Sequence, residues 1–181
     1  YVPGADLQGV HYAMEFLCAQ TRKDAGERGK NRLSAEGKRV VIIGGGDTGS
    51  DCVGIANRQG AASILQIDRN TKLPETIDKS LVWPYWPKQF TISSSQEEGC
   101  ERDFRIQTKR IEGKRGKVEK IIACRVNSVG GRYVDEPGSE FSIEADMVLL
   151  AMGFAGPAKE VLDAFGVQRD MAGNVMAAAE G

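Results

Sequence analysis

Three glycines carry the clearest chemical signal in the sequence. Gly44, Gly46 and Gly49 have the spacing Gly-x-Gly-x-x-Gly. The first permits a sharp turn, the second has no Cβ and lets a phosphate approach the backbone, and the third lets a helix pack closely on a strand. Unpaired N–H groups and the positive end of the helix dipole then favour an anion. The spacing indicates a pyrophosphate site, with a purely structural turn as the alternative.

A carboxylate, Asp68, follows these glycines at the spacing typical of dinucleotide-binding sites. Asp68 ends the apolar run Ala61–Asp68, about twenty residues beyond the glycines, where an acid that binds the ribose of a dinucleotide is expected. Arg69 comes directly after it, and Lys72 follows three residues later. They either grip a 2′-phosphate or are solvated loop charges. The residues therefore leave both NADPH and NADH open as the cofactor.

A strand, a helix and a second strand must position these residues. The apolar run Val40–Ile43 is typical of a strand buried on both faces. The helical pattern that follows ends near Gly60 and places small and apolar residues on one face: Gly49, Cys52, Val53 and Ala56. With Ala61–Asp68 the unit is β-α-β, so we expect two parallel strands.

The flanking segments predict the elements around this unit. Val10–Gln20 is amphipathic and predicts a helix over one sheet face, and Thr21–Gly37 predicts an exposed loop. Ser93–Gly99 predicts a short helix with a capping box. Glu101–Gln107 predicts a third strand of the parallel sheet.

The segment 108–145 changes character. Alternating apolar residues are interrupted by turn signals at Gly113, Gly116, Gly130-Gly131 and Pro137-Gly138, which predict a three-stranded antiparallel meander. Asp146–Gly153 predicts a buried strand that returns to the parallel sheet, and Glu160–Phe165 predicts a short helix. The expected fold class is α/β, a Rossmann-like three-layer domain with a parallel sheet and an antiparallel β-meander crossover.

A long segment, Arg69–Ile92, contains Trp83-Pro84-Tyr85-Trp86-Pro87. Two prolines within four residues exclude a regular central strand or helix interior. Either the tryptophans pin this loop to its own domain, or the loop is a surface that meets another domain or subunit.

Composition narrows the class of protein further. The chain has 181 residues, 24 basic and 25 acidic, for a net charge of −1, which argues against nucleic-acid and membrane-surface partners. No apolar run approaches the roughly 20 residues of a membrane span. Four cysteines without a Cys-x-x-Cys pair, and a single histidine, argue against a metal site and suggest a reducing, cytoplasmic setting.

The order of elements resembles the pyridine-nucleotide domain of two-dinucleotide-binding flavoproteins, which in that family is inserted in an FAD domain. Local sequences are similar to the small (β) subunits of glutamate synthases. These are Gly-Gly-Gly-Asp-Thr-Gly-Ser-Asp-Cys (44–52), Trp-Pro-Tyr-Trp-Pro (83–87), Ser-Ser-Ser-Gln-Glu-Glu-Gly-Cys-Glu-Arg (93–102) and Ala-Asp-Met-Val-Leu-Leu-Ala-Met-Gly-Phe (145–154).

The resemblance implies an oxidoreductase that transfers a hydride from NADPH or NADH to FAD. Electrons then pass through iron–sulfur clusters to a glutamate-forming large subunit. FAD and the clusters would belong to the parent protein only. The expected partners are the FAD domain of the same parent chain and the large subunit. We expect this chain to hold the nicotinamide cofactor, NADPH by a slight preference, and to be inactive alone.

The resemblance also assigns roles to residues, none of them catalytic. The pyrophosphate would lie against Gly44, Gly45, Gly46, Asp47, Thr48 and Gly49, the ribose near Asp68, Arg69 and Lys72, the adenine near Glu98 and Gly99, and the nicotinamide near Ala151, Met152 and Gly153. Met152 stands where the broader superfamily has Thr. Another flavin-dependent reductase and a non-catalytic docking module remain alternative identities.

The same resemblance predicts a division of the chain. Residues 1–37 are the N-terminal segment and covering helix, 38–153 the NAD(P)H-binding domain with its meander at 108–145, and 154–181 a segment returning toward an FAD domain outside this chain. The start at Tyr1 without a Met suggests a piece of a longer protein.

Overall fold

The computed structural model describes residues 2–27, 33–77, 89–154 and 156–176. The chain divides into two compact units, Tyr1–Ala151 and Met152–Gly181. The sequence Trp83–Pro87, predicted to pin a loop or dock a partner, lies outside the described residues. No helix in the described part of the chain is long and apolar enough to cross a membrane.

A five-stranded parallel sheet forms the centre of the first unit. The strand order is β1-β9-β2-β3-β4, and every neighbouring pair is parallel. The strands are β1 Val10–Tyr12, β9 Met147–Leu150, β2 Arg39–Ile43, β3 Ser63–Asp68 and β4 Glu101–Phe104. The predicted β-α-β unit with parallel strands is therefore confirmed.

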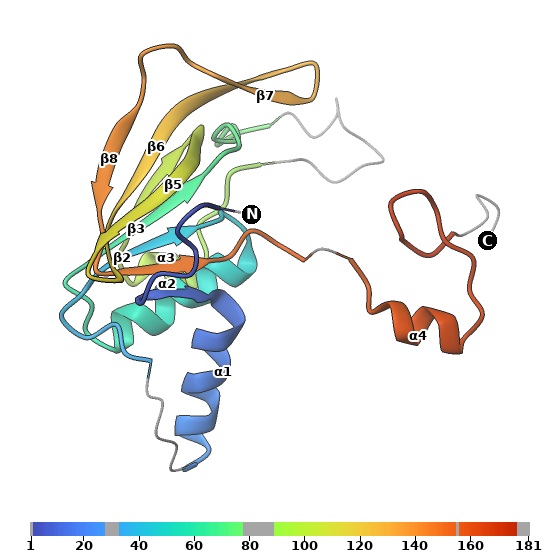
Figure 1. Ribbon diagram of the computed structural model, residues 1–181, viewed down its shortest axis with the longest axis horizontal. Helices are drawn as coiled ribbons and strands as arrows, with labels where there is room; N and C mark the ends of the chain where they lie inside the picture. Colours follow the sequence, from blue (N-terminus) through green and yellow to red (C-terminus); the bar gives the residue numbers. More distant parts are fainter. Residues whose placement is uncertain (1, 28–32, 78–88, 155, 177–181) are drawn as a thin grey trace. The chain divides into compact units, whose positions relative to one another are not determined.

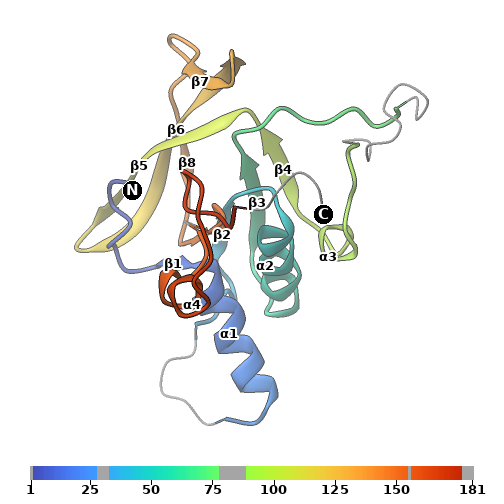
Figure 2. The same ribbon diagram turned by 90° about the vertical axis from the view of Figure 1, so that its right-hand side faces the viewer.

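Helices cover one face of this sheet. They are α1 Ala13–Asp24, α2 Asp47–Arg58 and the short α3 Ser94–Glu97, and Figures 1 and 2 show α1 and α2 on the same side of β2 and β3. Phe16 of α1 and Val53 of α2 pack with Val40, Ile42 and Leu149 of the sheet. The predicted buried face of α2 is confirmed, and Gly60 follows that helix with a φ of 81°.

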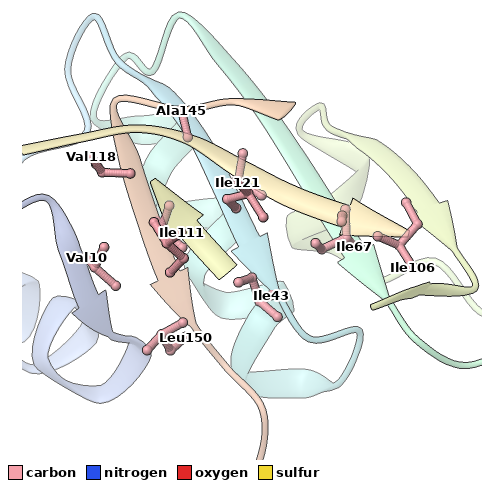
Figure 3. Close-up of a cluster of buried hydrophobic side chains, with 12 residues drawn as sticks. Val10, Ile43, Ile67, Ile106, Ile111, Val118, Ile121, Ala145 and Leu150 are labelled. Atoms are coloured by element: carbon pink, nitrogen blue, oxygen red, sulfur yellow. The ribbon is translucent and has the colours of Figure 1, made fainter. Parts of the chain in front are cut away.

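An antiparallel sheet covers the opposite face (Figure 1). It contains β5 Ile106–Lys114, β6 Lys117–Val129, β7 Arg132–Asp135 and β8 Phe141–Glu144. Ile111 and Ile121 of this sheet pack against Ile43, Ile67 and Leu150 of the parallel sheet (Figure 3). The fold is therefore three layers, helix, parallel sheet and antiparallel sheet, as the sequence predicts.

The N-terminal elements differ from the prediction. The expected helix Val10–Gln20 is instead an edge strand, β1, followed by a helix that continues through the first residues of the expected loop Thr21–Gly37 to Asp24. Three residues are too few to show a strand period. Pairing of Val10–Tyr12 with Val148–Leu150 decides their conformation.

The crossover into the meander also differs in detail. The predicted strand Glu101–Gln107 ends at Phe104 because Arg105 adopts a φ of 61°, and Ile106 already belongs to β5. The meander has a fourth strand, β7, which pairs with the second half of the long strand β6 while β8 pairs with the first half. The long strand β6 therefore pairs with two short strands, β7 and β8.

The described residues of the second unit include the helix α4 Lys159–Ala164. An isolated bridge joins Arg169 to Val175, and the Asp170 carboxylate accepts hydrogen bonds from the backbone of Ala172 and Asn174. The predicted helix Glu160–Phe165 is thus confirmed with its bounds moved by one residue.

A charged pair ties the beginnings of two central strands together. The Asp146 carboxylate, just before β9, accepts hydrogen bonds from the backbone N–H and the guanidinium of Arg39 at 2.9 to 3.0 Å. Arg39 also pairs with Glu144. The Arg39 hydrogen bonds lower the pKa of Asp146 from its usual 3.8 to about 2.

This pair predicts an acid-sensitive contribution to stability. Because the folded-state pKa is lowered, the contribution is fully present above about pH 4 and is lost as the pH falls through about 2. We expect the urea midpoint of Asp146→Asn to be lower than that of the wild type near pH 7. We also expect it to depend less on pH between about 5 and 2.

The matched control is Asp51→Asn, because Asp51 is exposed on α2 and pairs with no cation among the described residues. Equal pH dependence in the wild type and Asp146→Asn, measured by urea denaturation, would contradict the assignment.

Candidate functional site

The glycine loop joins β2 to α2 in a space that excludes side chains. Gly44 has a φ of 130°, and a Cβ on it would lie 2.1 Å from the Ala151 carbonyl oxygen at the end of β9. A Cβ on Gly45 would lie 2.1 Å from Asp68 Oδ2. The loop is therefore pressed against the ends of β9 and β3, the strands on either side of β2.

Gly49 and Gly46 face different surroundings. A Cβ on Gly49 would lie 2.3 Å from the Gly44 carbonyl oxygen, so this glycine allows α2 to approach the strand. A Cβ on Gly46 would have nothing within 4 Å among the described residues. Gly46 has a φ of −83°, which other residues adopt readily. Within the described structure, neither the backbone nor neighbouring atoms require a glycine at this position.

The first turn of α2 opens onto a cleft. Its N-cap, Gly46, offers no side-chain cap, and Ser50 is the first helix residue whose N–H reaches the Gly46 carbonyl. The N–H groups before it therefore lack intrahelical acceptors. Asp47 is exposed and lines the cleft with Gly45 and Gly46, whereas Thr48 is half-buried and does not line it. These amides and the helix dipole favour an anion here.

The cleft has a volume of about 580 Å³, within the range of small-molecule sites. Its walls come from the glycine loop, the end of β3, the segments around residues 70–73 and 89–91, α3, β4 and the β6–β7 hairpin. It lies at the carboxyl ends of the parallel strands, where ligands of open α/β sheets bind.

Asp68 stands beside the glycine loop. Its Oδ1 accepts hydrogen bonds from the backbone N–H and the side-chain amide of Asn70, both at 2.9 Å. Its Oδ2 is the atom that a Cβ on Gly45 would meet. The carboxylate is thus held between the loop and Asn70 and lines the cleft.

Arg69 and Lys72 contact two aromatic residues that line the cleft, Tyr133 and Phe90. The Arg69 guanidinium lies 4.8 Å from the ring centroid of Tyr133. Lys72 Nζ lies 2.8 Å from a Glu75 carboxylate oxygen and 4.6 Å from the ring centroid of Phe90. These two residues are not among those lining the described cleft. The binding of a 2′-phosphate by Arg69 and Lys72 therefore stays a prediction.

Hydrogen bonds between buried side chains hold the glycine loop in place. Gln66 Nε2 donates to the Gly44 carbonyl at 2.9 Å, and Gln96 Nε2 donates to Gln66 Oε1 at 2.7 Å. Gln96 in turn forms the capping box of α3 with Ser93, whose hydroxyl contacts that of Ser50 on α2. The predicted capping box is confirmed, but sequence reasoning missed Gln66, because glutamine in a strand normally indicates a solvent-facing position.

Arg102 is a second residue that sequence reasoning missed. It lines the cleft, and its guanidinium lies 4.7 Å from the ring centroid of Phe90 and 5.3 Å from that of Phe104. One signal in the sequence could have indicated it. Arg102 lies two residues before Phe104, in a strand that ends at the same edge of the sheet as the glycine loop.

Glu98 and Gly99 are not brought to the cleft. Glu98 pairs with Arg58, and the Gly99 carbonyl accepts from Asn57 Nδ2 at 2.7 Å. Both partners lie in the last turn of α2, and the glycine loop lies at its first turn. Placement of these two residues at the adenine side stays a prediction that this geometry does not support.

The predicted nicotinamide-end residues divide between the two units. Ala151 donates its N–H to the Ile43 carbonyl at 2.8 Å and lies next to Gly44. Met152, which is exposed, and Gly153, with a φ of 86°, belong to the second unit. Only Ala151 is thus positioned beside the glycine loop by the first unit.

No cysteine or histidine is among the described residues that line the cleft. Burial raises the pKa of Cys52 to about 12, and burial also lowers the pKa of His11. Neither residue lines the described cleft. Among the described residues, no group of three metal-ligating side chains comes together.

The sequence matches the pyridine nucleotide-disulphide oxidoreductase family over residues 2–180. The chain belongs to this family. An FAD-dependent pyridine nucleotide-disulphide oxidoreductase from Desulfovibrio vulgaris has the same fold, with a TM-score of 0.55 and 23% identity over 95% of this chain and 36% of that one.

The particular relatives are glutamate synthases, which confirms the resemblance. The chain is 43% identical to the small chain of the Mycobacterium tuberculosis glutamate synthase (NADPH), over 96% of this chain and 37% of the relative. It is 35% identical to the Schizosaccharomyces pombe glutamate synthase (NADH), over 96% of this chain and 9% of the relative. The chain thus spans just over a third of the small chain that it matches.

The steric contrast between two loop glycines yields a stability prediction. Gly49→Ala should cost about 1–3 kcal/mol, because its methyl group meets backbone that cannot move freely. Gly46→Ala should change stability by no more than about 1 kcal/mol, because the methyl group enters open space at an N-cap. Urea denaturation of both variants measures this difference. Equal losses would show that the loop is not packed in this way.

Proposed function

We propose that this chain is the NAD(P)H-binding part of a flavin-dependent oxidoreductase of the glutamate synthase small-chain type. Membership of the pyridine nucleotide-disulphide oxidoreductase family and 43% identity to a glutamate synthase small chain support the proposal. The observation that carries it is Gly46, a glycine whose missing side chain faces open space at the mouth of a cleft. A phosphate approaching the backbone explains that glycine.

In this proposal each part of the cleft has a task in binding. The pyrophosphate lies against the N–H groups of Gly45, Gly46 and the first turn of α2. Asp68 Oδ2 accepts a hydrogen bond from an adenosine ribose hydroxyl. Ala151, beside Gly44, marks the direction of the nicotinamide, and the buried Gln66–Gln96 chain keeps the loop in position.

The nicotinamide ring, when bound, supplies the hydride chemistry, which needs no acid or base from the protein. The task of this chain is to hold and orient the cofactor so that its reactive carbon faces an acceptor. We propose that the acceptor is FAD held by another part of a longer parent chain. Electrons then pass through iron–sulfur clusters to a large subunit. The domain boundaries 1–37, 38–153 and 154–181 belong to the same proposal.

Calorimetric titration of the 181-residue chain with NADPH and with NADH tests the binding step. We expect binding of at least one nucleotide, and a loss of about tenfold or more in affinity for Gly46→Ala, because its methyl group occupies the phosphate's approach. Urea denaturation serves as the control that this variant is folded. Wild-type affinity in a folded Gly46→Ala would contradict the phosphate-cradle role.

If FAD is held by another part of the parent protein, this chain alone should not oxidise NADPH. We expect no NADPH oxidation above background when the purified chain is mixed with an artificial electron acceptor and no flavin. The decrease in NADPH absorbance over time measures it. Flavin-free turnover that rises in proportion to the chain's concentration would show that a redox centre lies within these residues.

A further inference from the structure

Arg102 lies against an aromatic shelf, formed by Phe90 and Phe104, that lines the cleft. Phe90 and Phe104 pack edge to face with centroids 5.8 Å apart, and the Arg102 guanidinium lies within 5.3 Å of both ring centroids. Such cation–π contacts orient a guanidinium and leave its N–H groups available at the edge. The only hydrogen bond that Arg102 forms within the described structure goes from Nη1 to the Thr91 carbonyl, at 3.2 Å.

The strand register fixes which face Arg102 occupies. Gln66 is paired with Arg102, and Asp68 with Phe104. Register partners on parallel strands share a face, and successive residues alternate. Arg102 and Phe104 therefore share the face of Gln66 and Asp68, toward the helices. Asp103 between them points the other way and binds Arg125 of β6 at 2.7 and 2.8 Å.

Charge in the described part of the cleft is sparse. Asp47, Asp68 and Arg102 are its only charged lining residues within the described ranges. Arg69 and Lys72 do not line it, although they contact Tyr133 and Phe90, which do. Arg102 is thus the one basic residue among the described residues that line the cleft.

Three neighbouring strands present three different groups in order. The glycine loop follows β2, Asp68 ends β3, and Arg102 extends along β4 toward Phe104. Adjacent strands lie about 4.8 Å apart. This spacing is close to the distance between neighbouring parts of a nucleotide, such as a phosphate and the ribose next to it. Pyrophosphate, ribose and the substituent on the ribose 2′-oxygen follow one another in the same order.

We propose that Arg102 binds the 2′-phosphate of NADPH and makes this chain prefer NADPH to NADH. The inference rests on the proposed nucleotide-binding function. A guanidinium pairs with phosphate through two parallel N–H donors, and this pairing offsets the repulsion between the phosphate and the nearby Asp68 carboxylate. The aromatic shelf restricts the side chain, so that less conformational entropy is lost on binding.

The test compares ligands that differ only in the 2′-phosphate. The wild type, Arg102→Gln and Arg102→Lys are titrated calorimetrically with NADPH, NADH, 2′,5′-ADP and 5′-AMP. We expect Arg102→Gln to weaken NADPH and 2′,5′-ADP by about tenfold or more, and to change NADH and 5′-AMP by less than about threefold. Arg102→Lys keeps the positive charge but not the paired N–H donors of the guanidinium. We therefore expect it to weaken NADPH and 2′,5′-ADP less than Arg102→Gln does.

Arg58→Gln is the matched control, because Arg58 is an exposed arginine at the far end of α2. We expect it to leave all four affinities unchanged. Two results would overturn the proposal: equal weakening of 2′,5′-ADP and 5′-AMP by Arg102→Gln, or a 2′-phosphate-selective loss in Arg69→Gln or Lys72→Gln with none at Arg102. If the wild type binds neither NADPH nor NADH, the proposed function itself fails.

Discussion

Burial of the central strands on both faces is the constraint on which the structure depends. The exposed fraction is 0% for Met147, Val148 and Leu149 of β9 and at most 8% from Val40 to Ile43 in β2. Alternate residues of such strands point to opposite faces, so two separate covers are needed. Helices supply one cover and the antiparallel sheet the other. The glycine loop emerges where these strands end.

The layers are joined by a few charged contacts at the edge of the sheet. Asp103 of β4 forms a two-point pair with Arg125 of β6, which lowers the pKa of the Asp103 carboxyl. Arg105, at the left-handed break between β4 and β5, donates from Nε to the Val126 carbonyl at 3.1 Å. These contacts set where β4 leaves the parallel sheet. They therefore also set where Phe104 and Arg102 stand beside the cleft.

The sequence predicted the parts of the fold whose signals are local. An unbroken apolar run, three spaced glycines and a serine followed by glutamine predicted β2, the loop and the cap of α3. The edge strand β1 could not be predicted, because β9 rather than its own three residues holds it in place. The break at Arg105 and the extra strand β7 likewise depend on pairing with distant parts of β6.

The site was predictable in its backbone and less so in its side chains. The spacing located the loop and Asp68, but the direction of a long side chain depends on distant partners. Tyr133 and Glu75 hold Arg69 and Lys72. Gln66 was overlooked for a related reason: its burial needs Gln96, thirty residues away, to satisfy its amide oxygen.

The most direct test of the central claim is a crystal structure of this chain grown with NADPH. The account predicts the pyrophosphate against the N–H groups of Gly45 and Gly46, the ribose beside Asp68 and the adenosine half directed toward β4. A nucleotide bound at another surface, with the glycine loop unoccupied in crystals where the cleft is open to solvent, would contradict it.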